Sequence, residues 1–384
     1  MSQKAKKEYL ERIRFRYHHV KKNRKSAILD EFCRVCDYHR KYAIKLLRTP
    51  KCPKKRKPGK KSKYNNAEFI KHLKALWLAS DQMCSKRLKA AIPIWLPFYK
   101  EQTELPSEIE ALLTQISPAS IDRVLKPVKV KLKSKGLSGT KPGTLLKNQI
   151  PIKTHNWDVT QPGFMEADTV HHCGNSLLGQ YALSLTMTDI SSGWTENQAI
   201  WTKSAPGVVT AIQQITKRTP FQIKGFDCDN GSEFLNDALL EYFASQDHDI
   251  AFTRSRPYHK NDNAHVEQKN WTHVREWLGY ERYDSQELVE LINDFYAGPA
   301  RLFLNFFCPN LKLIKKERIN SKYIKKYDEP KTPYQRLMAH DKTPEHRKKE
   351  LQELFATLNP FTLKKEMDSK LQKIFKAKNA IQCK

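Results

Sequence analysis

Three runs in the middle of the chain have the short apolar pattern of β-strands: GFMEADTVHHC at residues 163–173, QYALSLTMTDI at 180–190 and WTENQAIWT at 194–202. Brief turn signals separate them. The segments that follow alternate in type, with helical patterns at 204–218, 232–246 and 261–280 and strand patterns at 221–229 and 249–255. Three strands followed by alternating strands and helices indicate an α/β domain with a mixed five-stranded sheet flanked by helices, which we place at 156–305.

Three acidic residues of this domain stand in unusual places. Asp168 lies in the middle of an apolar strand, Asp229 ends another strand just before a turn signal, and Glu267 lies on the long helix. A lone carboxylate is costly to remove from water, so each acid needs a partner. Because hard cations prefer carboxylate oxygens and water, a shared pair of Mg²⁺ ions would meet that need. Taken singly, each acid is explained more simply as an ordinary surface, turn or helix residue.

Charge is distributed unevenly along the chain, whose net charge is +28. Residues 1–63 carry +18, residues 64–160 carry +7 and residues 301–384 carry +12, whereas residues 161–300 carry −9. Basic segments of this density are typical of proteins that bind the phosphate backbone of nucleic acids. Divalent cations held by carboxylates would offset the repulsion between the acidic centre and DNA.

The N-terminal basic segment, residues 1–49, has three helical patterns. We interpret it as a helix-turn-helix domain, in which Ser26 caps the second helix and residues 38–48 form the recognition helix. An ordinary three-helix bundle with a solvated basic face fits the same pattern. In the helix-turn-helix interpretation the expected DNA contacts are Arg40, Lys41 and Lys45.

A second helical unit is expected at 66–126, and its end resembles a recognition segment in which Arg123 contacts DNA. Residues 50–65 form a basic linker before it, and residues 127–155, rich in Lys, Gly, Ser and Pro, form a linker after it. Residues 306–384 are again basic, with possible short strands near 311–327 and helices near 332–340, 344–357 and 360–377. We interpret this last region as a DNA-binding or assembly region.

The segments around the three acids carry a resemblance to a known family. The segment DCDNGSEF at 227–234 resembles the DNGxEF signature of integrase catalytic cores. The segment RPYHKNDNAHVEQKN at 256–270 resembles their PY…N…VE…N helix, and EADT at 166–169 matches their first-strand acid. The chain thus resembles retroviral-integrase-like DDE transposases of bacterial insertion sequences, over about residues 155–305.

This resemblance implies an RNase H-like fold and two-metal phosphoryl transfer. The catalytic and metal-binding residues would be Asp168, Asp229 and Glu267, with two Mg²⁺ ions per site and Mn²⁺ able to take their place. The reaction would be cleavage of double-stranded DNA at transposon ends and strand transfer into target DNA, with no nucleotide cofactor. Joining two ends to one target needs at least two active sites, so a homo-oligomer, dimer or tetramer, is expected on DNA.

Four residues near Glu267 are expected to touch the DNA backbone or to orient the helix: Lys260, Asn263, Lys269 and Asn270. Asn263 and Asn270 share a helix face with Glu267 because they lie four residues before it and three after it.

The eight cysteines are scattered, which in a chain without an apolar leader indicates free thiols. Cys33 and Cys36 lie downstream of His18 and His19, so a zinc site is an alternative to plain helix packing. No apolar stretch is long enough to span a membrane. We therefore expect a soluble protein of the cytoplasm, associated with the nucleoid in a bacterial cell, with no membrane partner.

Two other functions fit parts of the sequence. A DNA-binding regulator derived from a transposase would use the same basic arms, but it has no need of three converging acids. An RNase H-type nuclease without joining activity would use the same acids, but cutting alone does not require such extensive arms.

Overall fold

The computed structural model describes residues 1–49, 63–129, 161–229, 231, 233–254, 264–319 and 322–382. The chain divides into two compact units, residues 1–62 and residues 63–384. The linkers predicted at 50–65 and 127–155 lie almost wholly outside the described residues, so the domain limits drawn from the sequence stay predictions. None of the helices in the described ranges has both the length and the apolar character needed to cross a membrane.

The N-terminal unit consists of helices α1 (Gln3–His19), α2 (Lys22–Cys36) and α3 (Arg40–Arg48). Their apolar stripes meet in a small core that includes Phe32, Leu47 and the fully buried Cys36, as expected for a helix-packing cysteine. The prediction that Ser26 caps the second helix is wrong. The helix begins four residues earlier, at Lys22, and the Ser26 hydroxyl instead accepts a hydrogen bond of 2.9 Å from Arg40.

The second unit contains the predicted mixed sheet. Its five strands are β1 (Phe164–His171), β2 (Ala182–Asp189), β3 (Thr195–Trp201), β4 (Gly225–Cys228) and β5 (Ala251–Arg254). They lie in the order β3-β2-β1-β4-β5. The β1–β2 and β2–β3 pairs are antiparallel, whereas β4 runs parallel to β1 and β5 runs parallel to β4. This topology confirms the prediction of an RNase H-like α/β fold.

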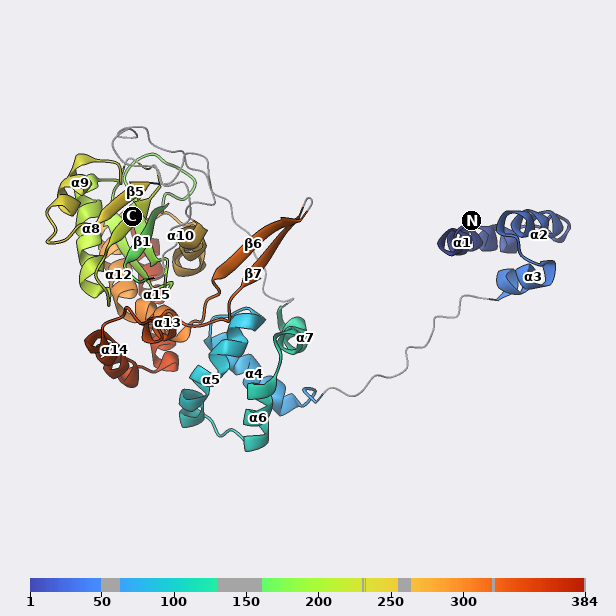
Figure 1. The fold of residues 1–384 in the computed structure, drawn as a ribbon, viewed down its shortest axis with the longest axis horizontal. Helices are drawn as coiled ribbons and strands as arrows, with labels where there is room; N and C mark the ends of the chain where they lie inside the picture. Colours follow the sequence, from blue (N-terminus) through green and yellow to red (C-terminus); the bar gives the residue numbers. More distant parts are fainter. Residues whose placement is uncertain are drawn as a thin grey trace. The chain divides into compact units, whose positions relative to one another are not determined.

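Helices cover both faces of the sheet (Figure 1). Helices α8 (Ala205–Arg218) and α9 (Asp237–Ala244) pack on the face that carries Met165 and Ala167 of β1. The other face carries Val170 and packs in the larger core together with α12 (Gln286–Phe295). Because side chains alternate along a strand, Asp168 points to the same face as Val170, and Thr169 points to the face of α8 and α9.

The predicted long helix is present from Ala264 to Leu278, but it is not uniformly α-helical. It consists of α10 (Ala264–Lys269), the π-helical segment η1 (Asn270–Arg275) and the short α11 (Glu276–Leu278). The Trp271 indole donates a hydrogen bond of 2.9 Å to the Glu276 carboxylate. These two residues are five apart, which is also the separation of residues joined by backbone hydrogen bonds in a π-helix.

The remaining elements belong to the same unit. Before the sheet domain in the sequence come α4 (Ala67–Ala79), α5 (Ser85–Gln102), α6 (Ser107–Gln115) and α7 (Pro118–Lys129). On its C-terminal side lie η2 (Tyr296–Ala300), η3 (Phe303–Phe307), the ribbon of β6 (Leu313–Ile319) and β7 (Lys322–Tyr327), α13 (Pro333–Met338), α14 (Glu345–Thr357) and α15 (Pro360–Gln382). Trp95 joins these regions, because its indole donates to the Phe307 carbonyl at 2.9 Å and its ring contacts Phe303 and Phe361 edge-on.

A buried histidine follows the end of β1. His172 is fully buried, and its Nε2 lies 2.7 Å from the Ser184 hydroxyl, which lies 2.8 Å from the Tyr296 hydroxyl. Burial, with a smaller effect of Arg275, lowers the pKa of His172 from 6.5 to about 3. The folded protein therefore holds this ring neutral at pH values where the unfolded chain binds a proton.

His172 should make folding sensitive to acid. Between pH 6.5 and about 3 only the unfolded state binds the proton, so wild-type stability should fall as the pH drops, by about 2 kcal/mol between pH 6.5 and pH 5. The measurement is urea unfolding of the wild type and of His172→Gln at pH 7 and pH 5. The contribution of the other titrating groups, mainly Asp and Glu, is the same in both proteins and cancels when their unfolding free energies are subtracted. An equal pH dependence of the unfolding free energy in both proteins would contradict the role of His172.

Candidate active site

The pairing of β1 with β4 brings two of the three predicted acids together. In the parallel register Glu166 lies opposite Asp227 and Ala167 lies opposite Cys228. Continuing this register by one residue places Asp168 beside Asp229, just past the end of β4. Asp168, in the middle of β1, and Asp229, directly after the end of β4, therefore lie side by side.

The third predicted acid reaches this place on α10. Glu166 holds the beginning of that helix, because its Oε2 accepts hydrogen bonds of 3.1 Å from the backbone N–H groups of His265 and Val266. The first N–H groups of a helix have no partner within the helix, so a buried acceptor is a strong fixing point. Glu267 follows directly and is exposed, and it acts on the pKa of both Glu166 and Asp168.

A second contact ties the helix to β1. The Asn270 side-chain amide donates a hydrogen bond of 2.6 Å to Asp168 Oδ2, while the Thr169 backbone N–H donates to Oδ1 at 2.8 Å. Both oxygens of Asp168 are thus oriented by neighbours. This contact fits the predicted role of Asn270 in orienting the helix.

Burial and mutual repulsion both act on the acids. Burial, then Asp229, raises the pKa of Asp168 well above its usual value. Burial, then Glu233, raises the pKa of Asp229 to about 6. Burial also raises the pKa of Glu166 to about 8. Carboxylates gathered in this way lack enough positive charge around them, which is the setting that a divalent cation relieves.

Asp229 and Glu267 both act on the pKa of Asp168, so the three carboxylates lie near one another. Within the described residues, no three His, Cys, Asp or Glu side chains are placed to hold one metal ion. Carboxylate oxygens are the ligands that hard divalent cations such as Mg²⁺ prefer, so Asp168, Asp229 and Glu267 are the residues that could hold such ions, with water and phosphate oxygens as further ligands.

Glu233 forms a second charged cluster on the α9 side of β1. It accepts a hydrogen bond of 2.8 Å from the Thr169 hydroxyl, and its other oxygen lies 2.9 Å from Lys203 Nζ. Burial would raise its pKa, but the bonds from His171 and Lys203 outweigh burial and hold it at about 2. Glu233 is therefore ionised and raises the pKa of Asp229.

The sequence did not assign roles to Glu166, Glu233 or Lys203. Side chains alternate along β1, which places Glu166 on the same face as Asp168, and the DNGSEF motif contains Glu233. The sequence pattern could therefore have pointed to both residues as members of the site. Lys203 had no such signal, because its position depends on how the end of β3 meets the α9 region.

The predicted DNA contacts lie in several places. Lys41 and Lys45 are exposed on α3, Arg123 is exposed on α7, and Arg40 is bound to Asp30 and Ser26. Lys269 points away from the acids, with its Nζ 3.2 Å from the Gly193 carbonyl. Lys260 and Asn263 lie outside the described residues.

The Glu166 anchor can be tested without touching a predicted metal ligand. In Glu166→Ala the amides of His265 and Val266 lose a buried acceptor and should exchange with solvent about 10- to 100-fold faster. In Glu166→Gln the side-chain carbonyl still accepts, so exchange should stay near the wild-type rate. Hydrogen exchange resolved to single amides is the measurement, and unchanged exchange in Glu166→Ala would show that the anchor is not needed.

Among solved structures, the chain is similar to retroviral integrases. The BIV integrase catalytic core domain is 20% identical, with 45% of this chain and 91% of that chain covered and a TM-score of 0.30. The HTLV-2 integrase catalytic core domain in complex with magnesium is 18% identical, with 39% and 90% covered and a TM-score of 0.28. The simian T-cell lymphotropic virus intasome in complex with a PP2A regulatory subunit is 14% identical, with 57% and 83% covered and a TM-score of 0.29. These values are low, and the fold assignment rests on the strand order and directions described above.

No protein-family profile matches the sequence. Among curated proteins, the chain is 36% identical over 342 residues to the uncharacterized protein y4rM of Sinorhizobium fredii (strain NBRC 101917 / NGR234). The match covers 88% of this chain and 96% of the relative. At that identity and coverage, the protein belongs to the same family as y4rM.

Proposed function

We propose that the protein is a DDE-type DNA transposase that cleaves DNA at transposon ends and transfers the freed strands into target DNA. The observation that carries the proposal is the register of β1 with β4, which brings Asp168 in the middle of β1 beside Asp229 just past the end of β4, with Glu267 on a helix anchored to β1. The DNGSEF motif and the charge reversal of the chain support it.

In this proposal Asp168, Asp229 and Glu267 would together hold two Mg²⁺ ions. When bound, such ions activate a water or a DNA 3′-hydroxyl and stabilise the leaving oxygen. The protein's own part is to hold its carboxylates in place: Asn270 and the Thr169 N–H orient Asp168, and Glu166 fixes α10 so that Glu267 stays beside it. A hydrogen-bonded support of this kind typically contributes about 10- to 100-fold to metal affinity or activity.

The basic parts of the chain are proposed to bind the DNA. Besides α3 and α7, the β6–β7 ribbon suits this role. Lys315 and Lys326 lie directly opposite each other on its two strands, an arrangement that destabilises an isolated ribbon, and an exposed ion pair of 2.5 Å between Lys315 and Glu317 offsets part of that repulsion. Ile314 and Ile324 are 61% and 53% exposed. An anionic partner such as a DNA phosphate would relieve the repulsion between the two lysines. A two-stranded ribbon also has the right width for the major groove of DNA.

A homo-oligomer, dimer or tetramer, is proposed to form on the DNA, because two ends and one target require more than one active site. Each end would be held by the basic arms while the acidic sheet domain contacts the scissile strand.

The catalytic assignment is tested with the isosteric variants Asp168→Asn, Asp229→Asn and Glu267→Gln, which remove charge but not volume. Cutting and joining in Mg²⁺ should fall to background in each, because the ions lose a ligand, while binding of the duplex survives. The assay uses the full chain and labelled duplexes from the DNA that flanks the gene. Glu290→Gln, an exposed acid of α12, is the matched control and should keep activity.

The outcomes separate the alternatives. Full joining activity in any of the three variants would contradict the assignment of Asp168, Asp229 and Glu267 as the catalytic residues. Wild-type cutting without joining would indicate a nuclease, and binding without either reaction would indicate a regulator.

The ribbon is tested by the double variant Lys315→Gln/Lys326→Gln. Removing two phosphate contacts should weaken DNA binding and should lower the slope of log affinity against log salt by about 2. The control is Lys349→Gln/Lys365→Gln, which removes two exposed lysines from α14 and α15. Fluorescence anisotropy at several salt concentrations measures both, and equal slopes in the two proteins would exclude the ribbon as a contact.

A further inference from the structure

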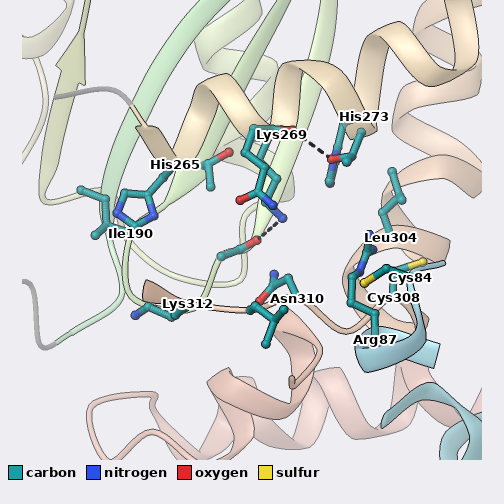
Figure 2. A pocket seen from close by; sticks show the side chains of 15 residues that line it. Cys84, Arg87, Ile190, His265, Lys269, His273, Leu304, Cys308, Asn310 and Lys312 are labelled. Atoms are coloured by element: carbon teal, nitrogen blue, oxygen red, sulfur yellow. Dashed lines mark hydrogen bonds between the residues drawn. The ribbon is translucent and has the colours of Figure 1, made fainter. Parts of the chain in front are cut away.

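A cavity of about 210 Å³ lies between α10, the beginning of α5 and the segment before β6 (Figure 2). Neither Asp168 nor Asp229 nor Glu267 is among the residues that line it. Helix α10 separates the two places: Asn270 points to Asp168, whereas Lys269 and His273 line the cavity. The cavity is therefore a feature apart from the predicted metal site.

Three cationic side chains from distant parts of the sequence meet at this cavity: Arg87 from α5, Lys269 from α10 and Lys312 from the segment before β6. Each is held by a backbone carbonyl. Arg87 Nε donates to Pro309 at 2.5 Å, Lys269 Nζ donates to Gly193 at 3.2 Å, and Lys312 Nζ donates to Ser191 at 2.6 Å. An ammonium has three donors and a guanidinium has five, so these bonds leave further donors available.

The described residues that line the cavity include no Asp or Glu. The acids that act on Lys312 are Asp189 and Asp328. Asp189 already accepts from Gly163 and Ser192, and Asp328 is paired with Arg336 at 2.5 Å. Asp81 and Glu276, which do not line the cavity, act on Arg87. Three partly buried positive groups that face one cavity still repel one another there, and an anion inside it would offset that repulsion.

Neutral polar groups complete the lining. His273 is only 5% exposed, and its Nε2 has no hydrogen-bond partner among the described residues, while its Nδ1 lies 2.9 Å from the Thr272 hydroxyl. The Thr272 hydroxyl also lies 3.3 Å from the Gln268 carbonyl, so its one proton goes either to that carbonyl or to His273 Nδ1, and Nε2 presents a lone pair or an N–H accordingly. Asn310 Oδ1 accepts from Arg336, which leaves its amide as a donor. A buried polar atom without a partner, such as His273 Nε2, is unusual in a folded protein and marks a place where a partner is missing.

The size of the cavity sets the size of the ligand. Drug-sized ligands occupy pockets of roughly 300–1,000 Å³, and a water occupies about 30 Å³ of liquid, so this cavity corresponds to about seven waters. That is room for one tetrahedral oxyanion and a few waters. Arginine and lysine are the side chains that bind phosphate groups most strongly.

We propose that this cavity binds a phosphate group, with Arg87, Lys269 and Lys312 as its charged ligands and Asn310 as a neutral donor. The phosphate is either a free anion or a group of a bound DNA strand, and the chemistry of recognition is the same for both. Since α10 carries both Lys269 and Glu267, a bound phosphate would restrain the helix that presents the catalytic acid. The proposal does not depend on the function proposed above.

The first experiment titrates inorganic phosphate into the full chain by calorimetry, at constant ionic strength maintained with chloride. One saturable site is expected in the wild type, and phosphate should raise its melting temperature by mass action. Lys312→Gln should weaken the binding at least about tenfold, since a charged donor is lost. Lys349→Gln, on the surface of α14, is the control and should bind as the wild type does.

The melting temperature without phosphate shows whether Lys312→Gln folds normally. If that variant is unstable, Asn310→Ala replaces it, with a smaller expected loss of phosphate affinity. Phosphate binding that is the same in the wild type, Lys312→Gln and Asn310→Ala would overturn the assignment of the site.

The second experiment separates the two sources by adding a DNA duplex. If a DNA phosphate occupies the cavity, the duplex should displace phosphate, and Lys312→Gln should lose more DNA affinity than Lys349→Gln. If the ligand is a free anion, phosphate and duplex should bind together, and the two variants should bind DNA equally. No saturable phosphate binding in the wild type, together with equal DNA affinity in the two variants, would overturn the proposal.

Discussion

The parallel pairing of β1 with β4 is the constraint on which the rest of the site depends. It fixes which residues of the two strands lie opposite each other, and so it determines that Asp168 and Asp229 are neighbours. Shifting this pairing by one residue would turn one of the two acids toward the opposite face, because side chains alternate along a strand. Strand β2, buried along its whole length, holds the central strand β1 in place from the other side.

The acids of the site are arranged in layers that have different tasks. Asp168 and Asp229 are partly exposed, and Glu267 is exposed. Behind them Glu166 satisfies the start of a helix, and Glu233 is neutralised by Lys203. Burial, with a smaller effect of neighbouring acids, raises the pKa of Asp168 and Asp229, whereas the bonds from His171 and Lys203 outweigh burial and keep the pKa of Glu233 low.

Much of this architecture was predictable from the sequence because it follows local patterns. The strand and helix order of the sheet domain, the ribbon near 311–327 and the three C-terminal helices have periodicities that neighbouring residues alone determine. The start of α2 was mispredicted because Lys21, which precedes it, makes no side-chain cap, whereas Ser26 looked like one. The roles of Glu166 and Lys203, and the meeting of Arg87 with Lys312, depend on packing between segments far apart in the chain, and no local pattern records that.

The π-helical segment after Lys269 has a consequence for how one helix can serve two sites. Each residue of an α-helix turns the chain by about 100°, so accommodating an extra residue within a turn rotates everything beyond it relative to what precedes it. The first part of the helix is fixed against β1, while Trp277 and Leu278 at its end pack in the larger core. The widened turn changes the direction in which the side chains beyond it point. The first part of the helix can therefore contact β1 while its end packs in the larger core, which a regular α-helix would not allow. Removing a single residue from this turn would rotate one end of the helix relative to the other. The contacts of both ends could then no longer form at the same time, although every side chain outside the turn stayed the same.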